Sequence, residues 1–463
     1  MGIVTQGVEP ASALLAAPPP RWLGEWARFA AGTRFADLPA EVAQRARLVL
    51  LDCIGAIAAG AQEAEAQTLA GRMIAREGNG DAAVIGHASG ARPGTAAFLN
   101  GTAGTMLELD EGNQYARGHP AIHVVPALLA APRGDGAALL VALALGYEMG
   151  ARVGIASKLN VAMHPHGTWG TLGAAVGIAK LHGASAEEFA GAINMASTLG
   201  LATSRRTMLE GGTVRNTYAG VSNMLGLTVW DLVRAGFIGE RDGVATIFGQ
   251  VSATDWQPAE MVRDLGSRWE IARNYFKRHA ACRYTHGALD ALSAIVARTG
   301  PLRPADVASI RVETYVWAAQ LDSPAAPNML AAKFSIPFAM ATYLAHGAAT
   351  VPAFRGPARE DPDILALASR VTVDEDPAMT AQLPGLRPAR VTLVLADGTR
   401  HEAAASTNRG DTEDPYTEIE VREKFQELAG PVYGRDRAAA IEDAVMGMAP
   451  HDEAFALVEL LKS

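Results

Sequence analysis

Apolar side chains recur every three or four positions over the first 270 residues, which is the spacing of helices that bury one face. The pattern predicts helices over residues 39–60, 137–155 and 170–181. Glu148 and Arg152 stand four residues apart in the second of these helices, and we expect them to pair on its surface. Alternating runs of the kind that predict strands are almost absent, so this half of the chain should be helical.

The pattern changes between residues 275 and 405. Short strand-like runs occur at residues 310–315, 371–373, 390–395 and 400–404. Asp397-Gly398 separates the last two runs, and an Asp-Gly pair in this position predicts a β-hairpin. Residues 333–346 have a helical pattern. This segment therefore predicts a smaller α+β domain, after which helices return at residues 418–428 and 436–461, the latter broken near Pro450.

Composition narrows the class of protein. The chain has 463 residues, more than one hydrophobic core usually accommodates, and 49% of them are apolar. A formal charge of −9 argues against nucleic acid or an anionic membrane as a partner, and an anionic substrate would need a locally basic pocket. The apolar runs fall short of the roughly 18 residues that cross a membrane, and the N-terminus lacks the pattern of a signal peptide.

Cysteine and histidine spacing argues against a structural metal. Cys53 and Cys282 stand alone, which excludes a disulfide framework and suits a reducing cytoplasm, where we expect this protein to work. His119 and His123 are four residues apart, but Pro120 interrupts any regular helix that could bring them to one face. We therefore predict no metal site.

Three polar segments stand out between the apolar helices. The first spans residues 108–120 and ends in Gly118-His119-Pro120, the second spans residues 163–170, and the third runs from Lys277 to His286. Loops that connect rigid helices are frequent locations of catalytic residues. The glycines of the second segment form GxxGxxG with no preceding strand, so we expect them to serve close helix packing and not phosphate binding.

These segments belong to a series of motifs that extends across nearly the whole chain. In order, the motifs are Leu51-Asp52-Cys53-Ile54-Gly55, Phe98-Leu99-Asn100-Gly101-Thr102, Gly118-His119-Pro120, His164-Pro165-His166-Gly167-Thr168, Gly212-Thr213-Val214-Arg215-Asn216, Tyr275-Phe276-Lys277 through His286, Lys333-Phe334-Ser335-Ile336-Pro337 and Gly410-Asp411. Their number, order and spacing resemble the MmgE/PrpD family, which includes dehydratases, decarboxylases and epimerases of small polycarboxylic acids.

The resemblance implies a fold that is mainly α. It implies a large all-helical domain of residues 22–272 and 410–463, a smaller α+β lid domain of residues 273–409, and a flexible tail over residues 1–21. It also implies an enzyme without a cofactor or metal, a homodimer, and a site between the two domains.

The resemblance assigns the site residues by position. The expected catalytic residues are Asp110, His119, His164, Lys277 and His286. His164 and His119 would act as base and acid in an open order, with Asp110 orienting one of them. The expected substrate-binding residues are Tyr115, His166, Arg205, Arg206 and Arg283, because fixed positive charge must meet the carboxylates and the dianion-like intermediate.

Three functions follow as alternatives. The first is a lyase for a small di- or tricarboxylic acid, and among lyases we expect a dehydratase in preference to a decarboxylase. The second is an epimerase of a dicarboxylate such as an iminodisuccinate-like compound, with His166 or His279 as the second base. The third is a non-catalytic carboxylate-binding protein. The sequence departs from the dehydratase and decarboxylase pattern at Asn113, His166 and Arg278, so the choice of reaction stays open.

Overall fold

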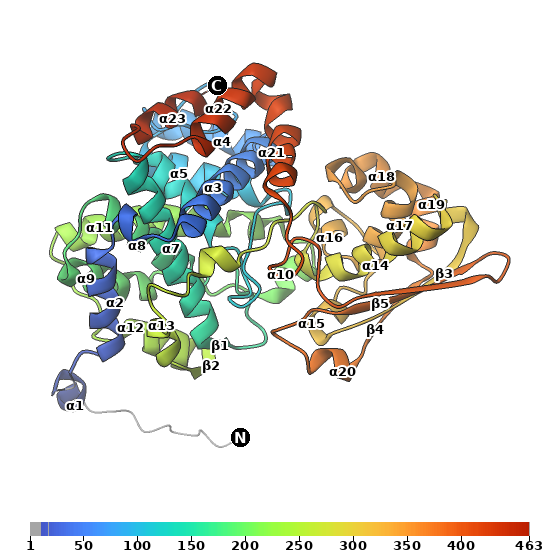
Figure 1. Cartoon of the computed structure of the whole chain (residues 1–463), viewed down its shortest axis with the longest axis horizontal. Coiled ribbons are helices and arrows are strands. Elements are labelled where there is room, and N and C mark those ends of the chain that lie inside the picture. Colours follow the sequence, from blue (N-terminus) through green and yellow to red (C-terminus); the bar gives the residue numbers. More distant parts are fainter. Residues whose placement is uncertain (1–10, 17, 463) are drawn as a thin grey trace.

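The chain folds into a helical domain and a smaller α+β domain that lie side by side (Figure 1). The structure is a computed structural model that describes residues 11–16 and 18–462. The flexible tail expected over residues 1–21 lies largely outside the described residues; within it, residues 11–16 form a short helix, α1 (Ala11–Ala16).

The N-terminal half supplies most helices of the larger domain. They are α2 (Arg21–Gly32), α3 (Ala40–Gly60), α4 (Ala64–Glu77), α5 (Pro93–Thr105), α6 (Val125–Ala130), α7 (Gly136–Ala156), α8 (Gly170–Leu181), α9 (Ala186–Thr198), α10 (Arg205–Leu209), α11 (Tyr218–Arg234), α12 (Gly243–Ala245) and α13 (Ala259–Val262). Short 3₁₀ turns lie between them, among them η2 (Ala121–His123), η3 (Thr213–Thr217) and η5 (Glu270–Arg273). The three helices predicted over residues 39–60, 137–155 and 170–181 are confirmed.

The chain returns to this domain at its C-terminal end. The returning helices are α21 (Glu418–Tyr433), α22 (Arg435–Met446) and α23 (Ala454–Leu461). Helix α21 packs against α3, and Lys424 on α21 forms a buried ion pair with Asp52 on α3 over 2.6 Å. The two ends of the helical domain are therefore joined in one core.

The smaller domain is built on a four-stranded sheet. Its elements are α14 (Arg283–Thr299), β3 (Val307–Thr314), α15 (Val316–Ala319), α16 (Met329–Lys333), α17 (Ile336–His346), α18 (Gly356–Glu360), α19 (Pro362–Ala368), β4 (Val371–Glu375), α20 (Pro377–Thr380), β5 (Ala389–Leu395) and β6 (Arg400–Ala405). The strand order is β4-β3-β5-β6, with β3 parallel to β4 and antiparallel to β5. The predicted Asp397-Gly398 hairpin joins β5 to β6, so the mainly α fold with a smaller α+β part is confirmed.

Three local features differ from the sequence expectation. The helical half contains a small antiparallel pair of strands, β1 (Ser157–Leu159) and β2 (Ala253–Trp256), each too short to show a pattern. The helix expected over residues 333–346 is two helices, because Ser335 leaves the helical conformation and caps α17 by accepting from the Phe338 N–H. The Glu148–Arg152 pair is fully buried, so its expected place on the surface was wrong.

Helix α7 is the central helix of the core. Within the described residues it alone is long and apolar enough to cross a membrane, yet 89% of its most apolar window is buried inside the protein. It packs against α8 at a point where Gly146 and Gly173 meet, and a Cβ at Gly173 would lie 2.8 Å from the Gly146 carbonyl oxygen. Gly173, the last glycine of the GxxGxxG run, thus serves close helix packing, as predicted.

Candidate active site

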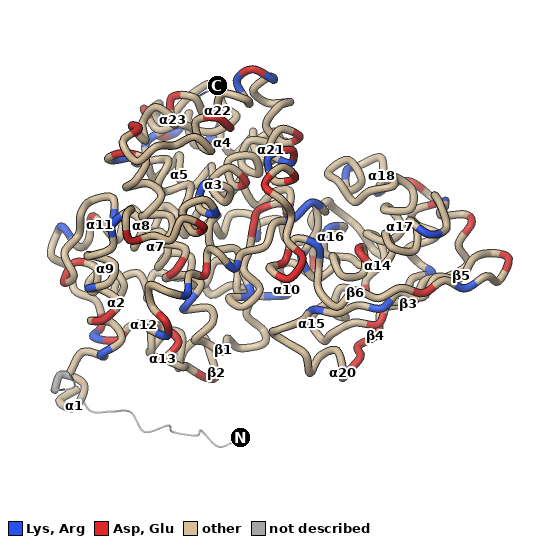
Figure 2. The backbone as a smooth tube through the Cα atoms, in the orientation of Figure 1, with Lys and Arg blue, Asp and Glu red and all other residues tan. Residues whose placement is uncertain are grey.

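A small, partly enclosed cavity of about 40 Å³ lies between the two domains. The helical domain contributes Glu108, Arg117, His119, His164, Pro165, Arg205, Met208 and Arg215, and the segment from residue 275 onward contributes Tyr275, Cys282, Arg283, Tyr284, Phe334 and Arg387. Five of these side chains are arginines. Figure 2 shows Lys and Arg positions on segments that face one another between the domains, around α10 and α16. The acidic protein therefore holds the basic pocket that an anionic substrate requires.

The loop between α5 and η2 carries His119 and Asp110. It is tied to the segment after η5 by two backbone hydrogen bonds between Gly112 and Tyr275. A Cβ at Gly112 would lie 2.3 Å from the Tyr275 hydroxyl, so this close approach needs glycine. Glu108 and Arg117 both adopt positive φ angles, 55° and 58°, which are uncommon outside glycine and occur where the surrounding structure fixes a functional loop.

His119 is held through its Nδ1 atom. That nitrogen lies 2.6 Å from the Glu111 carbonyl oxygen and 3.1 Å from Asp110 Oδ2. Both neighbours only accept hydrogen bonds, so Nδ1 carries the proton and the Nε2 lone pair is directed away from them. Burial lowers the pKa of His119, although the Asp110 carboxylate opposes that shift. Nε2 is therefore the basic nitrogen of this imidazole.

His164 presents the opposite arrangement. Its Nδ1 accepts a hydrogen bond from the His166 backbone N–H over 3.0 Å. The neutral ring consequently carries its proton on Nε2. Burial lowers the pKa of His164 well below its usual value, and the nearby Arg215 and Arg205 lower it further. His119 and His164 thus offer the cavity one acceptor nitrogen and one N–H donor.

His166 does not line the cavity. It is fully buried, and its Nδ1 atom lies 3.2 Å from Nε2 of His123. The four rings of His119, His123, His164 and His166 are near neighbours. Among the residues that the structure describes, no three His, Cys, Asp or Glu side chains are arranged to hold a metal ion.

Lys277 lies between two carboxylates beneath the cavity. Its Nζ atom is 3.6 Å from Asp110 Oδ1 and 3.7 Å from Glu108 Oε2, and the side chain is fully buried. Arg215 forms an ion pair with the other oxygen of Glu108. Burial alone would raise the pKa of Asp110, but the charges of His119, Lys277 and Arg215 outweigh it and hold that pKa below its usual value.

Arg283 and His286 both lie on the first turn of α14. Arg283 lines the cavity and pairs with Asp411 over 2.6 Å. His286 does not line it: Nδ1 is 2.9 Å from an Arg283 Nη atom and Nε2 is 3.2 Å from the Ala281 carbonyl oxygen. Both ring nitrogens are therefore occupied, and the structure places His286 as a support for Arg283.

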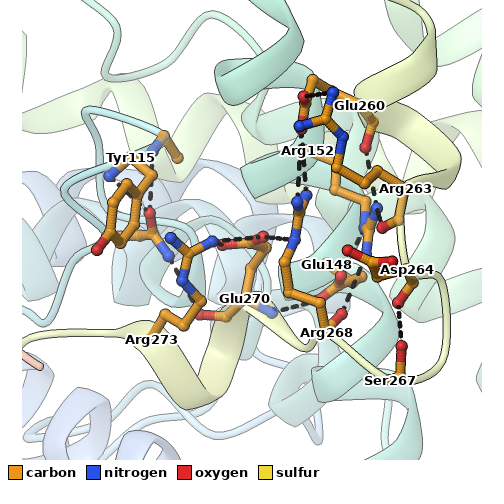
Figure 3. Close-up of polar contacts among 12 residues, drawn as sticks. Tyr115, Glu148, Arg152, Glu260, Arg263, Asp264, Ser267, Arg268, Glu270 and Arg273 are labelled. Carbon is orange, nitrogen blue, oxygen red and sulfur yellow. Dashed lines mark hydrogen bonds and ion pairs between the residues drawn. The ribbon is translucent and has the colours of Figure 1, made fainter. Parts of the chain in front are cut away.

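The remaining expected ligands divide between cavity and surface. Arg205 lines the cavity, whereas the neighbouring Arg206 side chain is 83% exposed and pairs with Glu210. Tyr115 is not among the residues that line the cavity. Figure 3 shows its ring under the guanidinium of Arg273, which is 3.6 Å from the ring centroid and also pairs with Glu270.

A buried network continues from Glu270 into the helical core. The Glu270 backbone N–H donates to Glu148, which pairs with Arg152 over 2.6 Å (Figure 3). Arg152 also donates to the backbone carbonyls of Glu260 and Arg263. The network fixes the segment that leads into Tyr275 and Lys277, which gives the buried Glu148–Arg152 pair a structural role.

Sequence reasoning assigned no role to three cavity arginines: Arg215, which stands in one of the motifs, and Arg117 and Arg387. Arg117 donates to the Gly154 and Ser157 carbonyl oxygens, and Arg387 donates to the Gln114 carbonyl oxygen over 2.8 Å. The positive φ of Arg117 gives no signal in the sequence, and Arg387 stands before β5 without a recognisable motif. Only the fold brings them to the cavity.

The cavity has three positive charges without an acidic partner. Arg215 pairs with Glu108, Arg283 pairs with Asp411, and Lys277 lies against Asp110. Arg117, Arg205 and Arg387 have no carboxylate within ion-pair distance among the described residues. Buried Nε–H groups without a hydrogen-bond partner occur on four cavity arginines: Arg205, Arg215, Arg283 and Arg387. Buried unpaired donors are costly, so the cavity is built for an anion with several acceptor oxygens.

Comparison with known proteins places this site in a family. The MmgE/PrpD N-terminal domain matches residues 24–255, and the MmgE/PrpD C-terminal domain matches residues 279–448. A cis-aconitate decarboxylase-like protein (oryM) of Aspergillus oryzae is 27% identical over 92% of this chain and 94% of its own length. The cis-aconitate decarboxylase of Aspergillus terreus is 25% identical over 92% of both chains, and that of Homo sapiens is 23% identical over 93% of this chain and 92% of its own. The chain therefore belongs to the MmgE/PrpD family.

Proposed function

We propose that this chain is a lyase that moves a proton beside a carboxylate of a small tricarboxylic acid. The observation that carries the proposal is the set of three unpaired arginines around one basic imidazole nitrogen, Nε2 of His119. Three carboxylates would match the charge of Arg117, Arg205 and Arg387, and Arg is suited to bidentate carboxylate binding. The fixed charges would also stabilise the extra negative charge that develops beside a carboxylate in the transition state.

Decarboxylation of an unsaturated tricarboxylate is the first reaction to test. Relatives that cover 92% of this chain carry the name cis-aconitate decarboxylase, although they are only 25–27% identical to it. Loss of CO₂ leaves an electron pair that the double bond and its carboxylate delocalise, and His119 would deliver a proton from Nε2 to carbon. The Asp110 carboxylate and the bound trianion favour the protonated ring. Each turnover takes up one proton from solvent and releases one CO₂.

Dehydration of a hydroxy-tricarboxylate is the second candidate, and the donor nitrogen of His164 favours it. In that reaction His119 Nε2 would take the proton from carbon, and His164 Nε2–H would donate a hydrogen bond to the hydroxide as it leaves. The hydroxide would become water with the proton that His119 then gives up. Epimerisation needs a second base on the opposite face of the carbon. His166 pairs with His123, and His279 faces Asp290 outside the cavity lining, which is why the lyase comes before the epimerase.

Incubation in D₂O separates these reactions. The purified protein is mixed separately with cis-aconitate, citrate and a chiral dicarboxylate such as malate, and products are followed by NMR and CO₂ release. CO₂ with one deuteron in the product identifies a decarboxylase, and interconversion of citrate with an alkene identifies a dehydratase. Deuterium in recovered dicarboxylate with inverted configuration would show an epimerase and contradict the lyase proposal. Saturable binding without turnover would indicate a protein that binds carboxylates without catalysis.

We also propose that the protein is a cytoplasmic homodimer, as its family resemblance implies. The helical domain exposes several large apolar side chains, of which Ile238 is 93% and Phe237 63% exposed. Light scattering on the purified chain should give twice the 48.4 kDa of one copy. If these two residues form the interface, Phe237→Ser with Ile238→Ser should reduce the mass to that of one copy. An unchanged mass would mean that other residues form the interface.

A further inference from the structure

A second, more open hollow adjoins the catalytic cavity. The lining of this outer groove includes Tyr115, Arg117, Lys158, Asp255, Gln257 and Trp317. Arg117 lines the outer groove and the catalytic cavity alike. The guanidinium of Arg117 therefore stands where the two spaces meet, and Lys158 adds a second positive charge on the outer side.

Trp317 stands at the same boundary. Its ring lines the outer groove, and it stacks on Tyr284 at 6.2 Å between ring centroids with an interplanar angle of 28°. The guanidinium carbon of Arg205 lies 5.7 Å from the centroid of the Trp317 ring. Tyr284 and Arg205 both line the catalytic cavity, so the indole separates that cavity from the groove.

The contact between Arg205 and Trp317 crosses the domain boundary. Arg205 begins α10 of the helical domain, and Trp317 lies on α15 of the lid, which is next to α10 in Figure 1. Arg205 has no carboxylate partner, and its buried Nε–H has no hydrogen-bond partner among the described residues. The indole ring is thus the main partner of this guanidinium, and a carboxylate would bind it more strongly than the ring does.

We propose that the outer groove is the route into the catalytic cavity and that the Arg205–Trp317 contact is its gate. An incoming anion meets Lys158 and Arg117 in the groove, and Arg205 then exchanges the indole ring for a carboxylate. The identity of that anion rests on the proposed function; the position of the gate does not. When a carboxylate binds Arg205, the contact between Arg205 and Trp317 is lost, so the arrival of substrate releases a contact between the domains.

Cys282 gives a direct measure of the gate. Its thiol lines the catalytic cavity, whereas the other cysteine, Cys53, is fully buried in the helical core. A small thiol reagent such as methyl methanethiosulfonate modifies Cys282 at a rate that depends on how often the cavity opens. The site of modification is read by peptide mass spectrometry at one pH, with the full-length protein and with Cys282→Ser as the negative control.

Trp317→Ala should raise the rate of Cys282 modification about tenfold, because a desolvated cation–π contact is worth about that factor in an equilibrium. Arg205→Ala should give the same rise, since it removes the other partner. The matched controls are Gln257→Ala, an exposed residue of the groove lining, and Arg206→Ala on the exposed side of α10; both should keep the wild-type rate. Trp317→Phe keeps a ring and should stay near wild type.

A competing route crosses the domain boundary elsewhere. Asn328 donates to the Gly211 carbonyl oxygen over 2.8 Å beside another hollow, which shares no lining residue with the catalytic cavity. A rise in Cys282 modification with Asn328→Ala, and none with Trp317→Ala or Arg205→Ala, would overturn the proposed gate. If Trp317→Ala does not fold, the rate of Cys282 modification in Arg205→Ala is compared with the wild-type rate instead.

Protection by ligand separates the gate from the proposed function. Citrate at saturating concentration should slow the modification of Cys282 in the wild-type protein, because it would occupy the cavity. Failure of citrate and cis-aconitate to protect would contradict the tricarboxylate proposal and leave the gate intact. A tenfold rise with Trp317→Ala and full protection by citrate would support both.

Discussion

The backbone decides the chemical character of both cavity imidazoles. A carbonyl oxygen beside Nδ1 of His119 leaves Nε2 as an acceptor, and a backbone N–H beside Nδ1 of His164 leaves Nε2 as a donor. The sequence placed both residues at the site but left their order open. The hydrogen bonds that distinguish the two rings come from the Glu111 carbonyl and the His166 backbone N–H, whose geometry no sequence pattern specifies.

Replacing His119 should abolish most turnover. His119→Gln keeps a polar side chain but loses the basic nitrogen, and we expect kcat to fall by about 10²–10⁴-fold, the usual contribution of a general acid or base. His182→Gln is the matched control, because His182 lies near the surface beside Arg133. Steady-state kinetics on the substrate identified in D₂O measures both, and a His119→Gln enzyme within tenfold of wild type would remove this residue from the mechanism.

Glu111 should make the stability of the fold depend on pH. Its carboxyl accepts from the Ala121 N–H and the Tyr147 hydroxyl, and burial raises its pKa to about 8 from an ordinary 4.5. A folded-state pKa above the unfolded value gives stability that is fully present below about pH 4.5 and is lost as the pH rises through 8. The glutamine of Glu111→Gln carries no titratable proton, so the melting temperature of the variant should fall less than that of the wild type between pH 5 and pH 8. Parallel curves for the two proteins would show that Glu111 is not the titrating group.

The site residues differ in how well the sequence could predict them. Motifs led to Asp110, His119, His164 and Lys277. The structure places His119 and His164 in the cavity lining and sets Asp110 between His119 and Lys277. Neither Arg206 nor Tyr115 lines the cavity, because position in a motif does not say which way a side chain turns. Arg117 lies in the first polar segment directly before the Gly118-His119-Pro120 motif, but nothing in the sequence turns its side chain toward the cavity, and Arg387 comes from a segment without a motif.

At the scale of elements, glycine positions set how closely the core helices approach. Gly146 and Gly173 lie at the α7–α8 contact, and neither helix could come so near with a larger residue. Helix existence was predictable because apolar spacing persists over several turns. The β1–β2 pair and the break at Ser335 were not predictable, since both depend on a few residues and on contacts distant in sequence.

Gly173→Ala should destabilise the protein by about 1–3 kcal/mol, the usual effect of overpacking a close contact. Its new Cβ would lie 2.8 Å from the Gly146 carbonyl oxygen, and backbone cannot move aside as a flexible side chain can. Gly71→Ala on α4 is the opposite case, because nothing lies within 4 Å of its Cβ position. Alanine there should stabilise the exposed helix by about 0.5–1 kcal/mol. Denaturation midpoints of the two variants should therefore move in opposite directions from wild type.

At the scale of the whole molecule, an acidic protein concentrates unpaired positive charge in one place. The formal net charge is −9, yet Arg117, Arg205 and Arg387 meet at the cavity without acidic partners. Two of them come from the helical domain and Arg387 comes from the lid, so the anion site is complete only when the domains are together. Composition alone could indicate that a basic pocket was needed, but not which arginines form it.

Arg387→Ala should therefore weaken the preference for three carboxylates over two. The variant keeps the His119 chemistry and the paired Arg215 and Arg283, but it removes one of the three uncompensated charges. We expect kcat/KM for a tricarboxylate to fall by about tenfold or more, because a charge-assisted hydrogen bond contributes about 1.5–3 kcal/mol. Binding of a matched dicarboxylate should change much less, since two free arginines remain for its two carboxylates.

Arg303→Ala is the control, because Arg303 pairs with Asp306 on the outer surface of the lid. If tricarboxylates and dicarboxylates lose the same factor, Arg387 supports the cavity wall and does not distinguish ligands by their number of carboxylates.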